Sequence, residues 1–214
     1  MSSVKSFWFW IRRKLNLGWL LLIIHPKSGI VLEGWSRSFR ANQSIDRYGN
    51  PIPWYTYSSI HFIESRLNNT LRIFEYGCGN STLYYAKRVS EIISVENDRE
   101  WAKKIVAQLP ANAKVVFRDQ EHQYVCEVGN HGQFDVIIID GLLNRLACTQ
   151  AAVNALTDQG IIIVDNSEWP EFIECVNFLA KNGFRELPFY GQTPITFVPS
   201  QTSIMYRPVN CLDI

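Results

Sequence analysis

Short apolar runs alternate with helix-forming stretches along most of this chain. The runs that predict strands cover residues 71–76, 92–95, 114–117, 135–139 and 161–164. The stretches between them predict helices over residues 98–109, 148–156 and 170–181. Runs at 184–189 and 203–207 predict a final antiparallel pair across a loop rich in glycine and proline. This alternation predicts a three-layer αβα sandwich around a doubly wound, mostly parallel sheet.

The first predicted strand is followed by a glycine turn. The strand carries Glu75 near its end, and Gly77 and Gly79 can then adopt the positive φ angles of a tight turn. Ser81 and Thr82 can cap the helix that follows. The next strand ends in Glu96, where open α/β sheets place the group that binds a ribose. The sequence therefore predicts a nucleoside cofactor.

The turn lacks the third glycine that dinucleotide-binding proteins place beside a pyrophosphate, because Thr82 stands there. The pattern Glu75-x-Gly77-x-Gly79, with the later acid Glu96, instead resembles the class I S-adenosylmethionine-dependent methyltransferases. The resemblance covers residues 60–207 and implies a Rossmann-like fold with seven strands. It implies that the turn passes under the methionine part of the cofactor, that Glu75 orders the turn and that Glu96 accepts both ribose hydroxyls. The cofactor-binding residues that we expect are Glu75, Gly77, Cys78, Gly79, Ser81, Glu96, Asn97, Asp119 and Asp140.

Two further predicted strands end in carboxylates, at Asp140 and at Asp165-Asn166. These oxygen ligands are of the kind that Mg²⁺ prefers, and the arrangement resembles that of catechol O-methyltransferase. That resemblance implies a metal site at Asp140, Asp165 and Asn166, and Arg145 fits it loosely. The chain departs from it in having no matching lysine base and in having Gly141 after Asp140. Acids at these positions also cap helices or shape a cleft in metal-free proteins, so we expect Asp140 to act as a metal ligand or as a general base.

The acceptor of a methyl group is recognised by residues that vary, because methyl transfer asks mainly for positioning and deprotonation. Turn-rich segments with aromatic side chains precede and follow the predicted sheet, at 49–55 and 190–194. The substrate-side residues that we expect are Trp54, Tyr55, Asn166 and Tyr190. In the alternative interpretation, Trp54 and Tyr55 only fasten the amino-terminal segment onto the sheet.

The composition favours one cofactor-binding domain. The chain has 214 residues, 47% of them hydrophobic, and we expect residues 60–214 to form the domain and residues 1–59 an accessory segment. A net charge of +1 argues against nucleic-acid binding driven by overall charge. Five cysteines without a C-x-x-C pair indicate a reduced, cytoplasmic protein. The four histidines lack metal-ligand spacing, and His122 and His131 keep a minor place as candidate bases.

The amino terminus is basic and aromatic, with no acid before Glu33. The apolar run at 15–24 is too short to span a bilayer, which needs roughly 20 apolar residues. Two interpretations stay open for this segment: peripheral contact with the anionic inner membrane face, or an accessory helix that covers the sheet or a partner subunit.

Two function classes follow. The first is a methyltransferase that acts on an oxygen of a small molecule or a glycan. The second is a non-catalytic cofactor- or partner-binding module on the same fold, although Glu75, Gly77, Gly79 and Glu96 together argue for catalysis. A nicotinamide oxidoreductase is disfavoured, because no Tyr-x-x-x-Lys proton relay follows the fourth strand.

Overall fold

The computed structural model describes residues 10, 11, 14, 20, 23 and 25–214. Most of the basic aromatic amino terminus lies outside these residues, so its role stays a prediction. In the part of the chain that is described, no helix is both long and apolar enough to cross a membrane.

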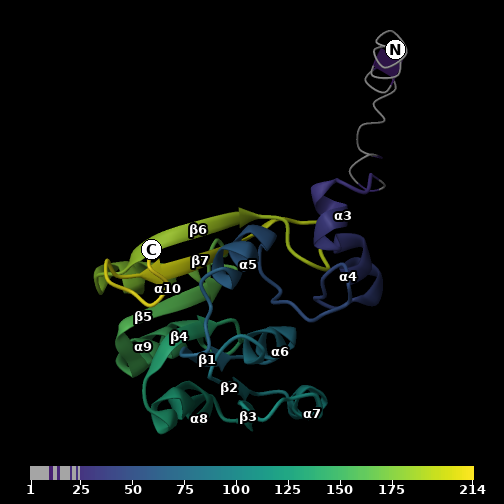
Figure 1. Ribbon diagram of the computed structural model, residues 1–214. Helices are drawn as coiled ribbons and strands as arrows, with labels where there is room; N and C mark the ends of the chain where they lie inside the picture. The colour runs from purple at the N-terminus through teal and green to yellow at the C-terminus, as the bar shows by residue number, and fades with distance from the viewer. Residues whose placement is uncertain (1–9, 12–13, 15–19, 21–22, 24) are drawn as a thin grey trace.

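Seven strands form one sheet in the order β3-β2-β1-β4-β5-β7-β6. Their bounds are β1 Arg72–Tyr76, β2 Glu91–Glu96, β3 Ala113–Phe117, β4 Phe134–Ile139, β5 Leu156–Asp165, β6 Arg185–Gly191 and β7 Ser200–Tyr206. The first five strands pair in parallel, and β7 pairs antiparallel with both β5 and β6. The predicted fold class is confirmed, and Figure 1 shows the twisted sheet with helices on both sides.

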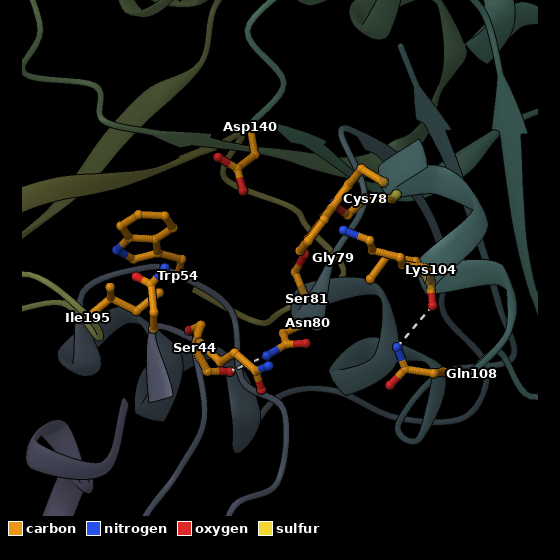
Figure 2. A pocket seen from close by; sticks show the side chains of 14 residues that line it. Ser44, Trp54, Cys78, Gly79, Asn80, Ser81, Lys104, Gln108, Asp140 and Ile195 are labelled. Atoms are coloured by element: carbon orange, nitrogen blue, oxygen red, sulfur yellow. Dashed lines mark hydrogen bonds between the residues drawn. The ribbon is translucent and has the colours of Figure 1, made fainter. Parts of the chain in front are cut away.

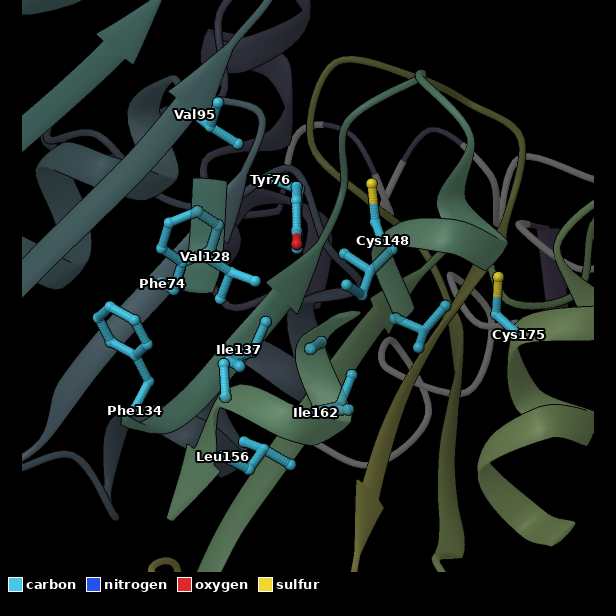
Figure 3. Close-up of a cluster of buried hydrophobic side chains, with 14 of the residues drawn as sticks. Phe74, Tyr76, Val95, Val128, Phe134, Ile137, Cys148, Leu156, Ile162 and Cys175 are labelled. Atoms are coloured by element: carbon cyan, nitrogen blue, oxygen red, sulfur yellow. The ribbon is translucent and has the colours of Figure 1, made fainter. Parts of the chain in front are cut away.

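Alternate residues of each strand are buried in two separate cores, because successive side chains point to opposite faces of a sheet. Phe74 and Tyr76 of β1 lie in the core that Figure 3 shows, which is covered by α8 (Glu121–Cys126), α9 (Arg145–Ala155) and α10 (Ile173–Lys181). Ile73 of the same strand faces α5 (Tyr57–Glu64) and α6 (Asn80–Ala86), while α7 (Arg99–Val106) packs on β2 and β3. The parallel strands are thus covered on both faces, as their continuous apolar runs predict.

Several helix boundaries differ from the sequence-based ones. The helix expected over 148–156 begins earlier, at Arg145, and Leu156 already opens β5. The helix expected from residue 170 begins at Ile173. Helix α8 and the 3-10 turn Glu127–His131 were not predicted, because α8 is short, polar and buries only Tyr124.

The segment before β1 contributes to the same core as the sheet. It forms α3 (Gly29–Glu33), α4 (Trp35–Ala41) and a turn that leads into α5. Ile52, Tyr55 and Tyr57 of this segment are buried with α5, α6 and the sheet. The indole N–H of Trp35 also donates to the Thr196 carbonyl oxygen at 2.6 Å, which joins α4 to the loop between β6 and β7. The amino-terminal segment therefore lies against the carboxyl edge of the sheet.

Candidate functional site

The glycine turn fits tightly between the ends of β2 and β4. Gly77 has φ 93°, and its N–H donates to the Val95 carbonyl oxygen at 2.8 Å. A Cβ atom at Gly77 would lie 3.2 Å from the backbone nitrogen of Gly141. Both the positive φ and this close approach require glycine.

Helix α6 begins directly after the turn, at Asn80, and Gly79 is its N-cap residue. The predicted capping by Ser81 is therefore wrong, since Ser81 already lies inside the helix. Thr82 does cap, because its hydroxyl accepts the Gly79 N–H at 3.0 Å. Glycine at the N-cap leaves this task to a side chain one turn further on.

Glu75 orders the turn through that same threonine. Its Oε2 atom accepts the Thr82 hydroxyl at 2.5 Å and the Ser94 hydroxyl at 2.7 Å. The Glu75 side chain is fully buried, and its Oε1 atom has no hydrogen-bond partner among the described residues. Glu75, Thr82 and the Gly79 N–H thus form a chain of hydrogen bonds beneath the turn.

Burial raises the pKa of Glu75 to about 7, because desolvation disfavours the carboxylate. The Ser81, Thr82 and Ser94 hydroxyls act in the opposite direction, and the nearby Asp140 raises the pKa slightly further. The Glu75 carboxyl therefore titrates near neutral pH.

Glu96 lies at the end of β2 with only 7% of its surface exposed. Its Oε2 atom accepts the Cys78 N–H at 3.0 Å, and its Oε1 atom accepts the N–H groups of Asn97 at 2.7 Å and Asp98 at 2.8 Å. A carboxylate offers about four acceptor positions, so these bonds leave room for one more donor. Its role toward a ribose stays a prediction.

Trp101 of α7 is a residue at this turn that sequence reasoning missed. Its indole N–H donates to the Cys78 carbonyl oxygen at 2.6 Å, which fastens α7 to the turn. The only sequence feature that could have indicated Trp101 was its position in the first helical turn after Glu96. Of the residues expected at the cofactor, Cys78, Gly79, Ser81 and Asp140 line a cavity at this edge of the sheet. The others line neither cavity, and two of them are exposed, Asn97 and Asp119; the remaining three are Glu75, Gly77 and Glu96.

A first cavity of about 340 Å³ opens over the glycine turn. Figure 2 shows Cys78, Gly79 and Ser81 on one side of it and Ser44, Trp54 and Ile195 on another, with Asp140 at its edge. Trp101, Lys104 and Gln108, from α7 and the residues just after it, complete the wall. Three segments far apart in sequence therefore enclose the space beside the turn.

Asp140 follows β4 and also lines a second cavity of about 420 Å³. The other residues around that cavity are Trp54, Leu142, Arg145, Asp165, Asn166, Trp169, Thr193, Thr196, Val198, Pro199 and Ser200. Asp140 and Trp54 are the two residues that both cavities share. A group bound in either cavity can thus contact the same carboxylate.

Arg145 holds the ends of β4 and β5 together. Its guanidinium donates to the carbonyl oxygens of Gly141 and Asp140, each at 2.7 Å, and to that of Asp165. The arginine side chain is 2% exposed, and one of its nitrogens lies 3.6 Å from the Asp140 carboxylate. Burial raises the pKa of Asp140, the Arg145 charge opposes this shift, and the Glu96 charge adds to it.

The Asp165 side chain is buried and hydrogen-bonded within the protein. Its carboxyl accepts the Thr202 hydroxyl at 2.7 Å, and the same hydroxyl accepts the Thr56 N–H at 3.2 Å. Burial and the neighbouring Asp140 raise the pKa of Asp165 well above its ordinary value, while the bond from Thr202 and the Arg145 charge oppose this shift.

The three residues of the predicted magnesium site all line the second cavity. Asp165 is bonded to Thr202, and Asn166 donates its amide N–H to the Ser200 hydroxyl at 3.0 Å. The amide oxygen of Asn166, which is the atom that would bind a metal, has no partner among the described residues. Among residues 25–214 and the few described before them, no three His, Cys, Asp or Glu side chains cluster as metal ligands. Beyond the shared position of these three residues, nothing in the described part of the chain supports a metal, and the magnesium site stays a prediction.

The predicted acceptor-side residues separate into two groups. Trp54 and Asn166 line the second cavity. Tyr55 is fully buried in the core, as the alternative interpretation held, and Tyr190 is 66% exposed on β6 and lines neither cavity. Of the candidate histidines, His131 is bonded to Glu127 at 2.8 Å and His122 lies beside Cys126, and neither lines either cavity.

No family model matches the chain, and no curated protein matches it in sequence. Solved structures do match in fold. An rRNA methylase from Streptococcus thermophilus is 13% identical with a TM-score of 0.55, covering 71% of this chain and 95% of that one. The N-methyltransferase NodS from Bradyrhizobium japonicum is 11% identical with a TM-score of 0.54, covering 71% and 93%.

The same fold also occurs with other reactions. A spermidine synthase from Thermotoga maritima is 20% identical with a TM-score of 0.55, covering 71% of this chain and 58% of that one. Likenesses at this level of identity establish architecture and leave the reaction open. The glycine turn and the cavity above it fit a nucleoside cofactor. This chain therefore has the fold of the class I S-adenosylmethionine-dependent methyltransferases.

Proposed function

We propose that this protein is an S-adenosylmethionine-dependent methyltransferase that methylates a hydroxyl oxygen of a small molecule or a sugar. The observation that carries the proposal is the position of Asp140, which faces both the cavity at the glycine turn and the second cavity. One carboxylate between a cofactor cavity and an acceptor cavity is where a general base for transfer belongs.

The cofactor is held by the residues around the turn. Gly79 lines the cofactor cavity, Gly77 lets the turn pack against Gly141, and Glu75 fixes the turn through Thr82. Glu96 keeps one acceptor position for a ribose hydroxyl. When bound, S-adenosylmethionine supplies a methyl group on a sulfonium whose leaving group is a neutral thioether.

Asp140 performs the proton transfer. Its raised pKa makes the carboxylate a stronger base than an exposed aspartate, while the Arg145 charge favours the ionised form. The proton of the acceptor hydroxyl passes to Asp140, and the acceptor oxygen forms the new carbon–oxygen bond. The electron pair of the broken carbon–sulfur bond stays on sulfur. The bonds from Arg145 to the carbonyl oxygens of Gly141 and Asp140 keep the base in place, and Thr202 holds Asp165 beside it.

The test is calorimetric titration of the full chain with S-adenosylhomocysteine, with NAD as the control. We expect micromolar binding of the first and none of the second. Asp140→Asn should keep the affinity for S-adenosylhomocysteine within about twofold and lower transfer to a hydroxylated acceptor by at least about 100-fold. A folded protein that binds neither nucleoside refutes the proposal and favours a partner-binding module on this fold. Undiminished transfer by Asp140→Asn removes Asp140 from the mechanism.

A further inference from the structure

The indole ring of Trp169 forms one wall of the second cavity and is supported by another aromatic ring. Trp169 stacks on Phe172, with ring centroids 5.8 Å apart and an interplanar angle of 13°. The guanidinium of Arg145 lies 3.9 Å from the centre of the Phe172 ring. The arginine that ties down Asp140 thus also holds the ring that supports Trp169. Trp169 nevertheless stays 44% exposed and lines the cavity.

A second indole lies along the same cavity. Trp54 comes from the segment before α5, is 49% exposed, and carries no core-packing role that would explain its position. Within the described part of the chain, neither Trp54 nor Trp169 gives its indole N–H to a protein acceptor. Two large apolar faces and two free donors therefore border one cavity. Indole groups with one apolar face and one polar edge suit ligands that are themselves apolar on a face and polar at the rim.

The remaining lining combines apolar side chains, among them Leu142, Val198 and Pro199, with a few polar groups. Asn166 uses its amide N–H for Ser200, but among the described residues its amide oxygen has no partner. Asp140 adds a carboxylate. An entirely apolar ligand would desolvate these groups without replacing their hydrogen bonds, which costs binding free energy. The lining therefore suits a ligand with an apolar face and hydroxyls at its edge.

We propose that the acceptor is a carbohydrate whose pyranose ring lies against Trp169, with a ring hydroxyl directed at Asp140. A saturated sugar ring has a face of C–H bonds that is attracted to the negative face of an indole, and hydroxyls around its edge for Asn166 and the indole N–H groups. A phenol or catechol offers its hydroxyls at one side only and leaves the other polar groups of the cavity unpaired. The inference rests on the proposed methyl transfer, because that function makes the second cavity an acceptor site.

The test is saturation-transfer difference NMR on the full chain with saturating S-adenosylhomocysteine. The probes are the methyl pyranosides of glucose, galactose, mannose and rhamnose, with catechol as the aromatic comparison. We expect saturation of the ring C–H protons of at least one pyranoside. Trp169→Ala should weaken its affinity by roughly fivefold or more, the size expected for one lost ring contact. Trp169→Phe should restore most of the affinity, because it keeps a ring on Phe172.

The control variant is Tyr48→Ala, which removes an aromatic side chain that is 69% exposed and lines neither cavity. It should leave pyranoside affinity unchanged. Calorimetry with S-adenosylhomocysteine separates the two proposals, since Trp169 does not line the cofactor cavity. Cofactor binding without any pyranoside signal, or with a signal from catechol alone, overturns the carbohydrate proposal and leaves methyl transfer standing. Pyranoside binding that Trp169→Ala does not weaken overturns the proposed position of the sugar.

Discussion

The buried carboxyl of Glu75 makes the stability of this protein depend on pH, and Glu75→Gln isolates that dependence. The pKa of Glu75 is about 7 in the folded protein, against an ordinary value of 4.5. At about 1.4 kcal/mol for each pH unit, this difference amounts to roughly 3 kcal/mol. Glutamine resembles the protonated acid, because its oxygen can still accept the Thr82 and Ser94 hydroxyls.

The sign follows from which state releases the proton first. Below pH 4.5 both states hold the proton, so the full contribution to stability is present. As the pH rises toward about 7, the unfolded chain ionises while folded Glu75 stays neutral, and the free energy of unfolding falls. Above about pH 7 both states are ionised and this term no longer changes.

The assay is urea unfolding followed by circular dichroism between about pH 4.5 and pH 8. Over this range the free energy of unfolding of the wild type should fall by roughly 3 kcal/mol more than that of Glu75→Gln. Asp140 and Asp165, whose pKa values are also raised, contribute to both curves and largely cancel in the difference. Parallel curves for the two proteins would show that the folded and unfolded states ionise Glu75 alike, which refutes the raised pKa.

Two further predictions concern the ends of β4 and β5. Gly141→Ala should destabilise the fold by more than about 2 kcal/mol, because its Cβ would lie 1.9 Å from the hydroxyl of buried Tyr124. Tyr124→Phe should recover part of this loss in urea unfolding, and a fully stable Gly141→Ala would contradict the packing. Arg145→Met leaves three carbonyl oxygens without a donor and should cost roughly 3 kcal/mol or more. It also removes the charge that lowers the pKa of Asp140, so the acid limb of the pH–rate profile should move to higher pH, and an unchanged profile would count against that coupling.

The sheet and its cofactor turn could be predicted from the sequence because their signals are local. Apolar runs of strand length mark β1 to β5, and the spacing of Glu75, Gly77 and Gly79 marks the turn. Each of these features depends on residues within a few positions of one another. Local sequence patterns were therefore enough to predict the fold and the position of Asp140.

The parts of the site that sequence did not predict depend on contacts between distant residues. Asp165 accepts a hydrogen bond from Thr202, which lies on the antiparallel strand β7, far along the chain. The sequence showed that Gly141 departs from the catechol enzyme. The reason for a glycine there is the close approach of Tyr124, which lies on α8, a helix without a clear apolar periodicity. Trp169 becomes a cavity wall only through Phe172 and Arg145.

Both cavities are walled on one side by chain segments that lie outside the parallel strands. Residues 42–44 and Trp54 precede β1, and residues 193–200 connect β6 to β7. The bond from Trp35 to the Thr196 carbonyl joins these two segments to each other. Acceptor preference can therefore diverge by exchange of these two coupled segments while Glu75, the glycine turn and Asp140 stay as they are. A graft that changes the acceptor should move both segments together, because either one alone would lose its half of the Trp35–Thr196 contact.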